Sequence, residues 1–466
     1  GDVDKATSIF ERKLEFVKTL PNNEEMKSDT MHKIGCLLAH KSKPKKALKM
    51  LDEALRMKKL VFDGKHKSVL ETTWAVAATS QTLGDNDKAL KEYSVLMDNM
   101  KLVDDIPVDT VAVHHSAGKL LFEGGKTDKA VQSFRQALNA AEFSGNAQLK
   151  SEITLNLANA LSTRGELDEA MKLYGTLLNT KSLKKTKVLL LTRFNRSLSL
   201  IKMGEVEEAR DVLHKIAKNR SPMADDLKGN IYLTLGNLAV SDGNTEEALG
   251  YFEKSLDLAE KDDISTHTHT KKSIAMAHLK AGQTGEAMST LEDLLQDFSR
   301  SDGKGKSVNL LKAEIWNCLA RVYKIEEDLP QAKNFAKLAL QTYKAELGEN
   351  NPITLRNVAN LQLILLEEAE DLEKSEAKSV IDAAKFELEE TLEAFVSLDD
   401  PWTYRLDVAS LKTNLGFIAI WQGKPKKAKK LVRQIKEIEL PPEHTLVRQI
   451  MVLEERIEEL EMKKKK

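Results

Sequence analysis

One pattern of apolar and polar positions recurs along almost the whole chain. A glycine is followed by four mostly polar residues, an alanine, three more residues and a large apolar residue, as in GKTDKAVQSF from Gly125 and GDNDKALKEY from Gly84. The alanines recur every 39 to 51 residues, and every 39 to 42 in the central part. They are Ala6, Ala47, Ala89, Ala130, Ala170, Ala209, Ala248, Ala287, Ala332, Ala377 and Ala428. Such a period indicates a repeat architecture.

A second helical pattern precedes each alanine. Two antiparallel helices approach closely only where side chains are small, so we expect a small residue on the first helix to face the alanine on the second. The glycine five residues before the alanine can adopt the left-handed conformation that ends a helix. In most repeats a small residue stands twelve positions before the alanine: Gly35, Ala77, Gly118, Ala158, Ser197, Gly236, Ala275, Ala320 and Gly416.

Because a single hairpin cannot bury its apolar face, neighbouring hairpins must stack. The sequence therefore predicts an all-α, right-handed solenoid of antiparallel helix hairpins. We expect residues 1–20 to be the second helix of a truncated repeat, and eight regular hairpins to follow over 24–342. An irregular hairpin with an acidic loop is expected over 353–395, a last hairpin over 404–437 and a C-terminal capping helix over 444–462.

The pattern resembles the tetratricopeptide repeat (TPR) superfamily over nearly the whole chain. The repeat WNCLARVY…LPQAKNFAKLA carries this likeness best, through Trp316, Leu319, Ala320, Tyr323, Ala332 and Ala339. The usual family period is 34, and the longer period here resembles the kinesin light chain and nephrocystin type. The segment Tyr343–Leu365 resembles the linker of that subgroup, with Asn351 where histidine is usual.

Composition narrows the class of protein. The 466 residues include 72 acidic and 71 basic side chains, which argues against a globally basic nucleic-acid coat and a polyacidic tail. The two cysteines lie 282 positions apart, which favours a reducing, cytoplasmic compartment. There is no apolar run long enough to span a membrane. Since the chain begins with glycine and inside the repeat pattern, we expect a leader or further domain before it, and organelle targeting stays open.

Signals for catalysis are weak. The phosphate-binding, nucleophile-elbow and zinc-protease motifs are absent, so we expect no enzyme activity and no cofactor. His267 with His269, and His114 with His115, provide fewer ligands than zinc usually needs, so no metal is expected. Cys36 and Cys318 are interpreted as packed thiols.

The TPR resemblance implies that first helices line a concave groove that binds peptides. Asparagine offers a donor and an acceptor, so an asparagine ladder could bind the backbone of an extended peptide. The same residues could instead bond neighbouring repeats and set the superhelical pitch. A basic face on one repeat favours an acidic peptide. The groove candidates are His115, Lys119, Asn156, Asn159, Asn195, Asn237, Asn317, Arg321, Lys324, Asn360 and Asn414.

Three lysine clusters lie at Lys41–Lys49, Lys181–Lys187 and Lys424–Lys436. They are either solvated helix faces or contacts for an acidic surface, and without interleaved aromatic residues they do not favour nucleic acid. Near the C-terminus, apolar residues recur at alternating intervals of four and three from 446 to 460. This heptad stripe either caps the last repeat or pairs with a coiled-coil partner.

The sequence therefore favours a non-catalytic scaffold or adaptor that binds peptide segments or neighbouring proteins in its groove. One alternative is a fixed architectural subunit of a large assembly. Another is the regulatory arm of an enzyme whose catalytic part lies before Gly1.

Overall fold

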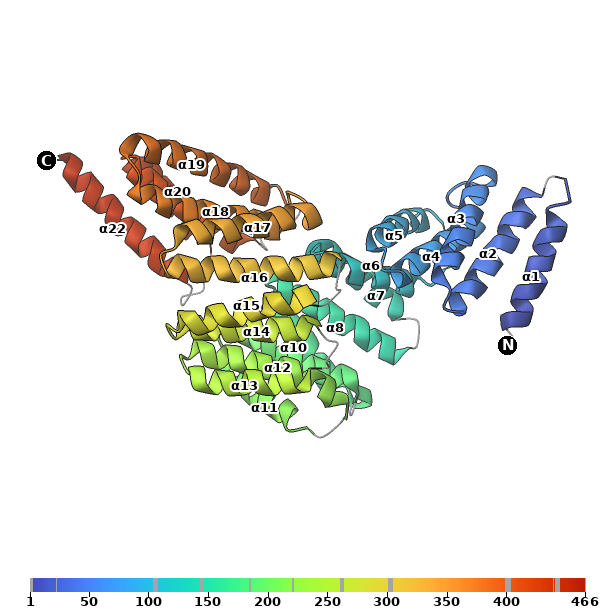
Figure 1. Cartoon of the computed structure of the whole chain (residues 1–466). Helices are drawn as coiled ribbons and strands as arrows, with labels where there is room; N and C mark the ends of the chain where they lie inside the picture. Colours follow the sequence, from blue (N-terminus) through green and yellow to red (C-terminus); the bar gives the residue numbers. More distant parts are fainter. Residues whose placement is uncertain are drawn as a thin grey trace. The chain divides into compact units, whose positions relative to one another are not determined.

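A computed structural model describes residues 3–21, 23–103, 108–142, 146–183, 186–219, 222–259, 264–300, 305–398, 404–438, 440 and 445–465. This part contains 22 α-helices, two short 3₁₀ helices and no strand (Figure 1). The chain divides into two compact units, Gly1–Thr192 and Arg193–Lys466, with the boundary inside one helix, α10 (Lys187–Met203). The lysine cluster at Lys181–Lys187 lies partly outside the described residues. The connections that contain Pro401–Trp402 and Pro441–Pro442 lie outside them at these residues.

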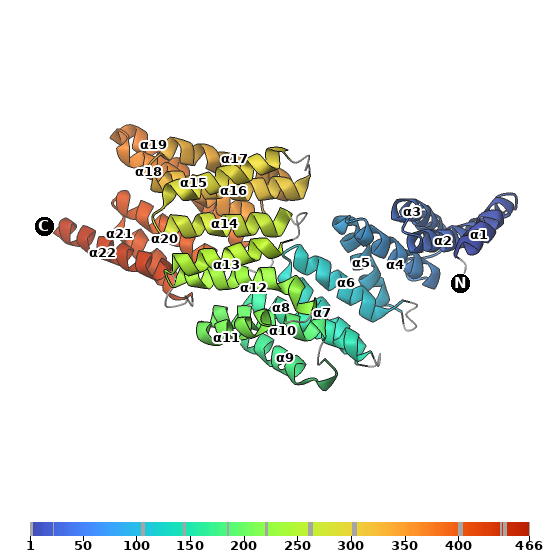
Figure 2. The ribbon, with the colours of Figure 1, turned by 60° about the horizontal axis from the view of Figure 1, so that its bottom comes forward.

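The first unit begins with a single helix, and hairpins follow it. Each hairpin packs its two helices on each other and then on the next hairpin (Figures 1 and 2). The helices are α1 (Val3–Val17), α2 (Glu24–His40), α3 (Pro44–Val61), α4 (Lys67–Thr82), α5 (Asn86–Met100), α6 (Thr110–Glu123), α7 (Thr127–Ala141), α8 (Ala147–Arg164) and α9 (Leu167–Asn179), with η1 (Lys181–Leu183).

The second unit continues the same arrangement to a final single helix. Its helices after α10 are α11 (Val206–Ala217), α12 (Pro222–Ser241), α13 (Thr245–Leu258), α14 (Ile264–Lys280), α15 (Thr284–Arg300), α16 (Lys306–Ile325), α17 (Leu329–Leu347), α18 (Pro352–Glu368), α19 (Lys374–Val396), α20 (Arg405–Trp421), α21 (Pro425–Lys436) and α22 (Thr445–Lys465). The acidic loop between α18 and α19 contains η2 (Ala369–Asp371). The predicted solenoid of stacked antiparallel hairpins is confirmed.

The turns of nine hairpins have the predicted left-handed residue, and the turn between α18 and α19, which contains η2, does not. Seven repeats place glycine there, for example Gly165 with φ of 94°. Two repeats place another residue at the same position: Ser42 (φ 54°) and Glu327 (φ 61°). A residue with a Cβ atom pays a steric cost in this conformation, so these two turns are strained relative to the others.

Replacing Glu327 with glycine should therefore stabilise the α16–α17 hairpin by about 1 kcal/mol, because the left-handed backbone would no longer meet a Cβ atom. Urea denaturation of the wild type and the Glu327→Gly variant measures this. The matched control is Glu326→Gly, one residue earlier at ordinary φ and exposed, which should destabilise slightly. Equal effects of the two substitutions would contradict the assignment of strain to Glu327.

The seam between paired helices differs in one respect from the expectation. A Cβ atom added to Gly236 would lie 2.4 to 2.9 Å from the ring of Phe252, and one added to Gly118 would lie 2.7 Å from Phe134. The atoms nearest to the small residue thus belong to the large residue four positions after the alanine, and at Gly35 the Ala47 carbonyl also lies close, at 3.4 Å. The reason is that the ring needs the open backbone surface that glycine leaves. In the last repeat the equivalent Gly416 faces Leu453 of α22.

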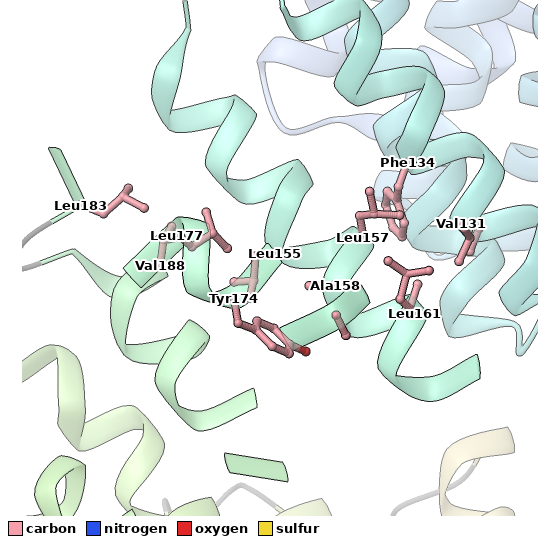
Figure 3. Packing of buried hydrophobic residues seen from close by; sticks show 13 residues of the cluster. Val131, Phe134, Leu155, Leu157, Ala158, Leu161, Tyr174, Leu177, Leu183 and Val188 are labelled. Carbon is pink, nitrogen blue, oxygen red and sulfur yellow. The ribbon is translucent and has the colours of Figure 1, made fainter. Parts of the chain in front are cut away.

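The core of each repeat is built on this seam. Around α8, Tyr174 lies beside Ala158 and Phe134 lies beside Leu157 (Figure 3). Both aromatic residues are 1% exposed, and they are among the largest fully buried side chains. Their burial stabilises each hairpin by a few kcal/mol against its neighbour.

Ion pairs also join successive second helices at a fixed register. The residue five after one alanine pairs with the residue just before the next alanine. Arg135 on α7 lies 2.9 Å from Glu169 on α9, and Asp52 on α3 lies 2.6 Å from Lys88 on α5. These pairs are partly exposed, so they set spacing more than they add stability.

Candidate functional site: the face lined by first helices

First helices of neighbouring repeats contact one another within each unit. In the first unit α2 contacts α4 and α6 contacts α8; in the second, α14 contacts both α12 and α16, and α18 contacts α20. Second helices pack on the first helix of the next hairpin, as α3 packs on α4 and α7 on α8. The first helices therefore form one continuous layer in each unit, and the eleven candidate residues all belong to first helices.

Polar side chains bridge the first helices of the first unit. His115 on α6 lies 2.8 Å from the Asn156 amide nitrogen on α8, measured from its Nε2. His32 on α2 likewise lies 3.1 Å from the Thr72 hydroxyl on α4, measured from its Nδ1. Burial lowers the pKa of His115, with a smaller effect of the nearby Lys119 ammonium, so the imidazole is neutral at pH 7. Asn156 is thus engaged between repeats.

Asn159 is engaged inside its own hairpin. The Tyr174 hydroxyl donates to its Oδ1 at 2.8 Å, which satisfies the polar end of a buried ring. Lys119, one turn after His115, is exposed. In the first unit, then, the two asparagines contribute to packing, and Lys119 is the candidate binding residue with an exposed side chain.

In the second unit, four polar residues form one stripe along α16. Glu314, Asn317, Arg321 and Lys324 follow one another at intervals of three, four and three, so they share a face. At one end Glu314 accepts a hydrogen bond from Lys272 of α14. At the other end Lys324 lies 2.7 Å from a Glu367 oxygen of α18. The stripe therefore lies in the first-helix layer, between two inter-repeat contacts.

The middle of this stripe is partly open. The Asn317 side chain forms a hydrogen bond with the Tyr343 hydroxyl. Burial and the Glu314 charge raise the pKa of Tyr343, and the bond to Asn317 partly opposes this increase. Arg321 and Asn360, which lies on α18, are exposed. No ion pair to Arg321 occurs among the residues that the structure describes.

The remaining asparagines differ in exposure. Asn237 is exposed, and its carbonyl accepts from the Ser241 hydroxyl. Asn195 and Asn414 are half-buried, and the Asn195 carbonyl accepts from Ser199. In both contacts a serine hydroxyl donates to a backbone carbonyl within one helix, so the asparagine side chains take no part in them.

A buried polar cluster of the first unit was missed by sequence reasoning. Lys58 on α3 is 1% exposed, and its Nζ lies 2.7 Å from Asp29 of α2. The Ser68 hydroxyl donates to the same carboxylate at 3.0 Å, and His32 lies beside them. The signal was present, because Lys58 follows Ala47, Leu51 and Leu55 on the apolar stripe of its helix.

This cluster makes stability depend on pH. Burial and the Lys58 charge lower the pKa of His32 from 6.5 to about 4, against the opposing pull of Asp29. The unfolded chain then binds a proton more readily than the folded chain, so stability is full above about pH 6.5 and falls as the pH drops toward 4. With solvent screening, we expect a loss on the order of 2 kcal/mol.

Hydrogen exchange of α2 and α4 amides at pH 7 and pH 5, corrected for intrinsic rates, measures this loss. The His32→Gln variant, which keeps a polar group but cannot titrate, should show a flatter profile. A profile as steep as that of the wild type would show that other groups, such as His114 and His115, are responsible; burial also lowers their pKa.

The histidine pairs do not gather metal ligands. Nδ1 of His269 lies 3.8 Å from Glu314, and His114 is buried with its Nδ1 unpartnered. Within the described ranges, no group of three or more histidine, cysteine, aspartate or glutamate side chains could hold a metal ion. Burial raises the pKa of the Cys36 and Cys318 thiols, so neither is an activated nucleophile.

The C-terminal stripe packs inside the chain. Leu446, Ile450, Leu453 and Ile457 are buried against α20 and α21. Lys436 and Lys427, from the last lysine cluster, pair with Glu454 and Glu389. No helix in the described part has both the length and the apolar content needed to cross a membrane.

Comparison with known proteins agrees with this fold. Two family models described as tetratricopeptide repeat match residues 115–178 and 229–262. Among curated proteins, no sequence matches the chain significantly. Similar solved structures include the apo quorum sensor NprR from B. thuringiensis, with 16% identity, a TM-score of 0.51 and coverage of 77% of this chain and 99% of that one.

Two further structures are less similar. A tetratricopeptide repeat protein from Parabacteroides merdae has 18% identity, a TM-score of 0.44 and coverage of 64% and 98%. Yeast Tom70 has 15% identity, a TM-score of 0.49 and coverage of 97% and 92%. At these identities the similarity concerns the fold alone. Together with the stacked hairpins, the two family matches confirm the predicted resemblance to the tetratricopeptide repeat superfamily.

Proposed function

We propose that the chain is a non-catalytic protein-binding scaffold whose first-helix layer holds an acidic segment of a partner protein in a reducing compartment. The observation that carries this proposal is the α16 stripe, in which exposed Arg321 lies between two inter-repeat contacts. An exposed guanidinium that has no carboxylate partner among the described residues can bind a carboxylate from a partner protein in a bidentate manner.

Asn360 and Asn317 support the same surface. The Lys324–Glu367 pair relates α16 and α18 by 43 positions, and the same offset relates Asn317 to Asn360. The two amides therefore lie at a similar level along two first helices that the Lys324–Glu367 pair joins, and the exposed one can bond the backbone of an extended segment. Lys119 and Asn237 are the other exposed candidates on first helices.

Affinity purification from the native source, with the wild type and an Arg321→Glu variant compared by mass spectrometry, tests the proposal. Arg321→Glu should lose the partner, whereas Lys337→Glu, exposed on the second helix α17, should retain it. If Arg321→Glu retains every partner, the binding proposal at this repeat fails. Asn156→Ala with Asn159→Ala is a less specific test, because Asn159 also holds Tyr174.

The same purification separates the alternatives. Partners of an adaptor should bind reversibly and elute as salt rises, because the proposed contact is a screened ion pair. Partners that stay at fixed stoichiometry through high salt would indicate an architectural subunit. The enzyme-arm alternative requires catalytic sequence upstream of Gly1 in the full open reading frame.

A further inference from the structure

A groove of about 750 Å³ opens between the second helices α1 and α3 of the first unit, on the side away from the first-helix face. Its floor is apolar: Leu14 comes from α1, Ile34 and Leu38 from α2, and Met50 from α3. Leu14 and Ile34 belong to the buried core beneath, so the floor is a fixed surface. The groove is large enough for several side chains of a ligand.

Two residues that line this groove, Glu11 and Lys46, do not form the ion pair that bridges second helices in other repeats. Glu11 lies five positions after its alanine, like Asp52 and Arg135. Lys46 lies one position before the next alanine, like their partners Lys88 and Glu169. In this repeat no ion pair joins Glu11 to Lys46 within the described residues, and both line the groove. The second helices are thus not bridged at this point.

A later repeat fills the same space with aromatic side chains. Tyr251 on α13 is at the position of Met50, three after its alanine, and His214 on α11 is at the position of Glu11. Their ring centroids lie 6.2 Å apart. With methionine and glutamate at these positions, the first repeat lacks the two rings, which explains why it has a groove.

The two walls carry different charges. The charged residues that α3 contributes to the groove lining, Lys46 and Lys49, are both basic, whereas α1 contributes Glu11 and Glu15 together with Arg12. An adjoining hollow of about 380 Å³ adds Lys41 and Lys43, although Lys41 is paired with Asp4 at 2.5 Å. The α3 wall is therefore the strongly charged one, and it is positive.

From this floor and this wall, we propose that the α1–α3 groove is a second docking site, which binds an amphipathic helix of a partner protein. The apolar stripe of that helix lies on Leu38 and Met50, and its acidic flank faces Lys46 and Lys49. A helix suits the groove because it would pack between α1 and α3 in the way that neighbouring helices pack throughout the array. This site is separate from the binding surface on the first-helix layer proposed above.

Fluorescence anisotropy with two synthetic helical peptides of about four turns tests the site. Both peptides carry leucines at helical spacing; one has glutamates along a flank, and the other has glutamines there. The acidic peptide should bind saturably and more tightly than the neutral one. Lys46→Glu with Lys49→Glu should weaken the acidic peptide about fivefold or more and change the neutral peptide by less than about twofold.

Two control variants define the site. Lys45→Glu, exposed on the same helix but outside the groove lining, should leave both peptides unchanged. Met50→Gln should weaken both, because it makes the floor polar. Far-UV circular dichroism confirms that each variant is folded. If neither peptide binds, or if Lys45→Glu weakens the acidic peptide as much as the groove variant does, the proposal is wrong.

Discussion

Gly236→Ala should destabilise the α12–α13 hairpin by about 2 kcal/mol. An alanine Cβ at this position would lie 2.4 to 2.9 Å from three ring atoms of Phe252, closer than real Cβ atoms come. The ring is fully buried, so it cannot swing into solvent, and either the helices separate or the ring leaves its rotamer. Alanine is otherwise the better helix former, so only the clash can produce a loss.

Gly229→Ala on the same helix is the matched control. An added Cβ there meets nothing closer than 3.8 Å, so the substitution should stabilise by up to about 1 kcal/mol. Urea denaturation and hydrogen exchange of α12 and α13 measure both effects. Gly236→Ala combined with Phe252→Leu should recover part of the loss, and strict additivity of the two substitutions would contradict the seam assignment.

The hairpins were predictable because the rules that create them are local. Gly84 and Gly423 end first helices for a conformational reason that is readable within a few residues, and both have positive φ. Ala47 and Ala130, which the repeat frame marks, are fully buried. The close approach of Phe134 to Gly118 was not predicted, because the frame shows which residues share a seam but not the depth to which Phe134 reaches.

The state of each candidate site residue was less predictable, since it depends on a side chain about forty residues away. Asn156 meets His115, and Lys324 meets Glu367, whereas Arg321 has the same type of helix position without such a partner. The two interpretations of the asparagines, peptide binding and local bonding, therefore differ residue by residue. Which one applies follows from the register between repeats.

Asp29→Ala should destabilise the first unit by about 3 kcal/mol. The substitution leaves the Lys58 ammonium, which is 1% exposed, with the Ser68 carbonyl at 3.3 Å as its one hydrogen-bond acceptor among the described residues. An uncompensated buried charge costs more than the ion pair itself contributes. Hydrogen exchange of α2, α3 and α4 should show the loss, while the helices of the second unit keep their protection, because solenoid stability is mostly a nearest-neighbour property.

Lys58→Met separates charge burial from packing. Methionine has a similar shape and needs no partner, so this variant should lose less stability than Asp29→Ala, even though it removes the same ion pair. Removing the ammonium should also raise the pKa of His32 above about 4, since Lys58 is the second cause of its depression after burial. NMR titration of the His32 ring reads this directly. A larger loss for Lys58→Met than for Asp29→Ala, or an unmoved His32 pKa, would show that Lys58 acts through packing and not through its charge.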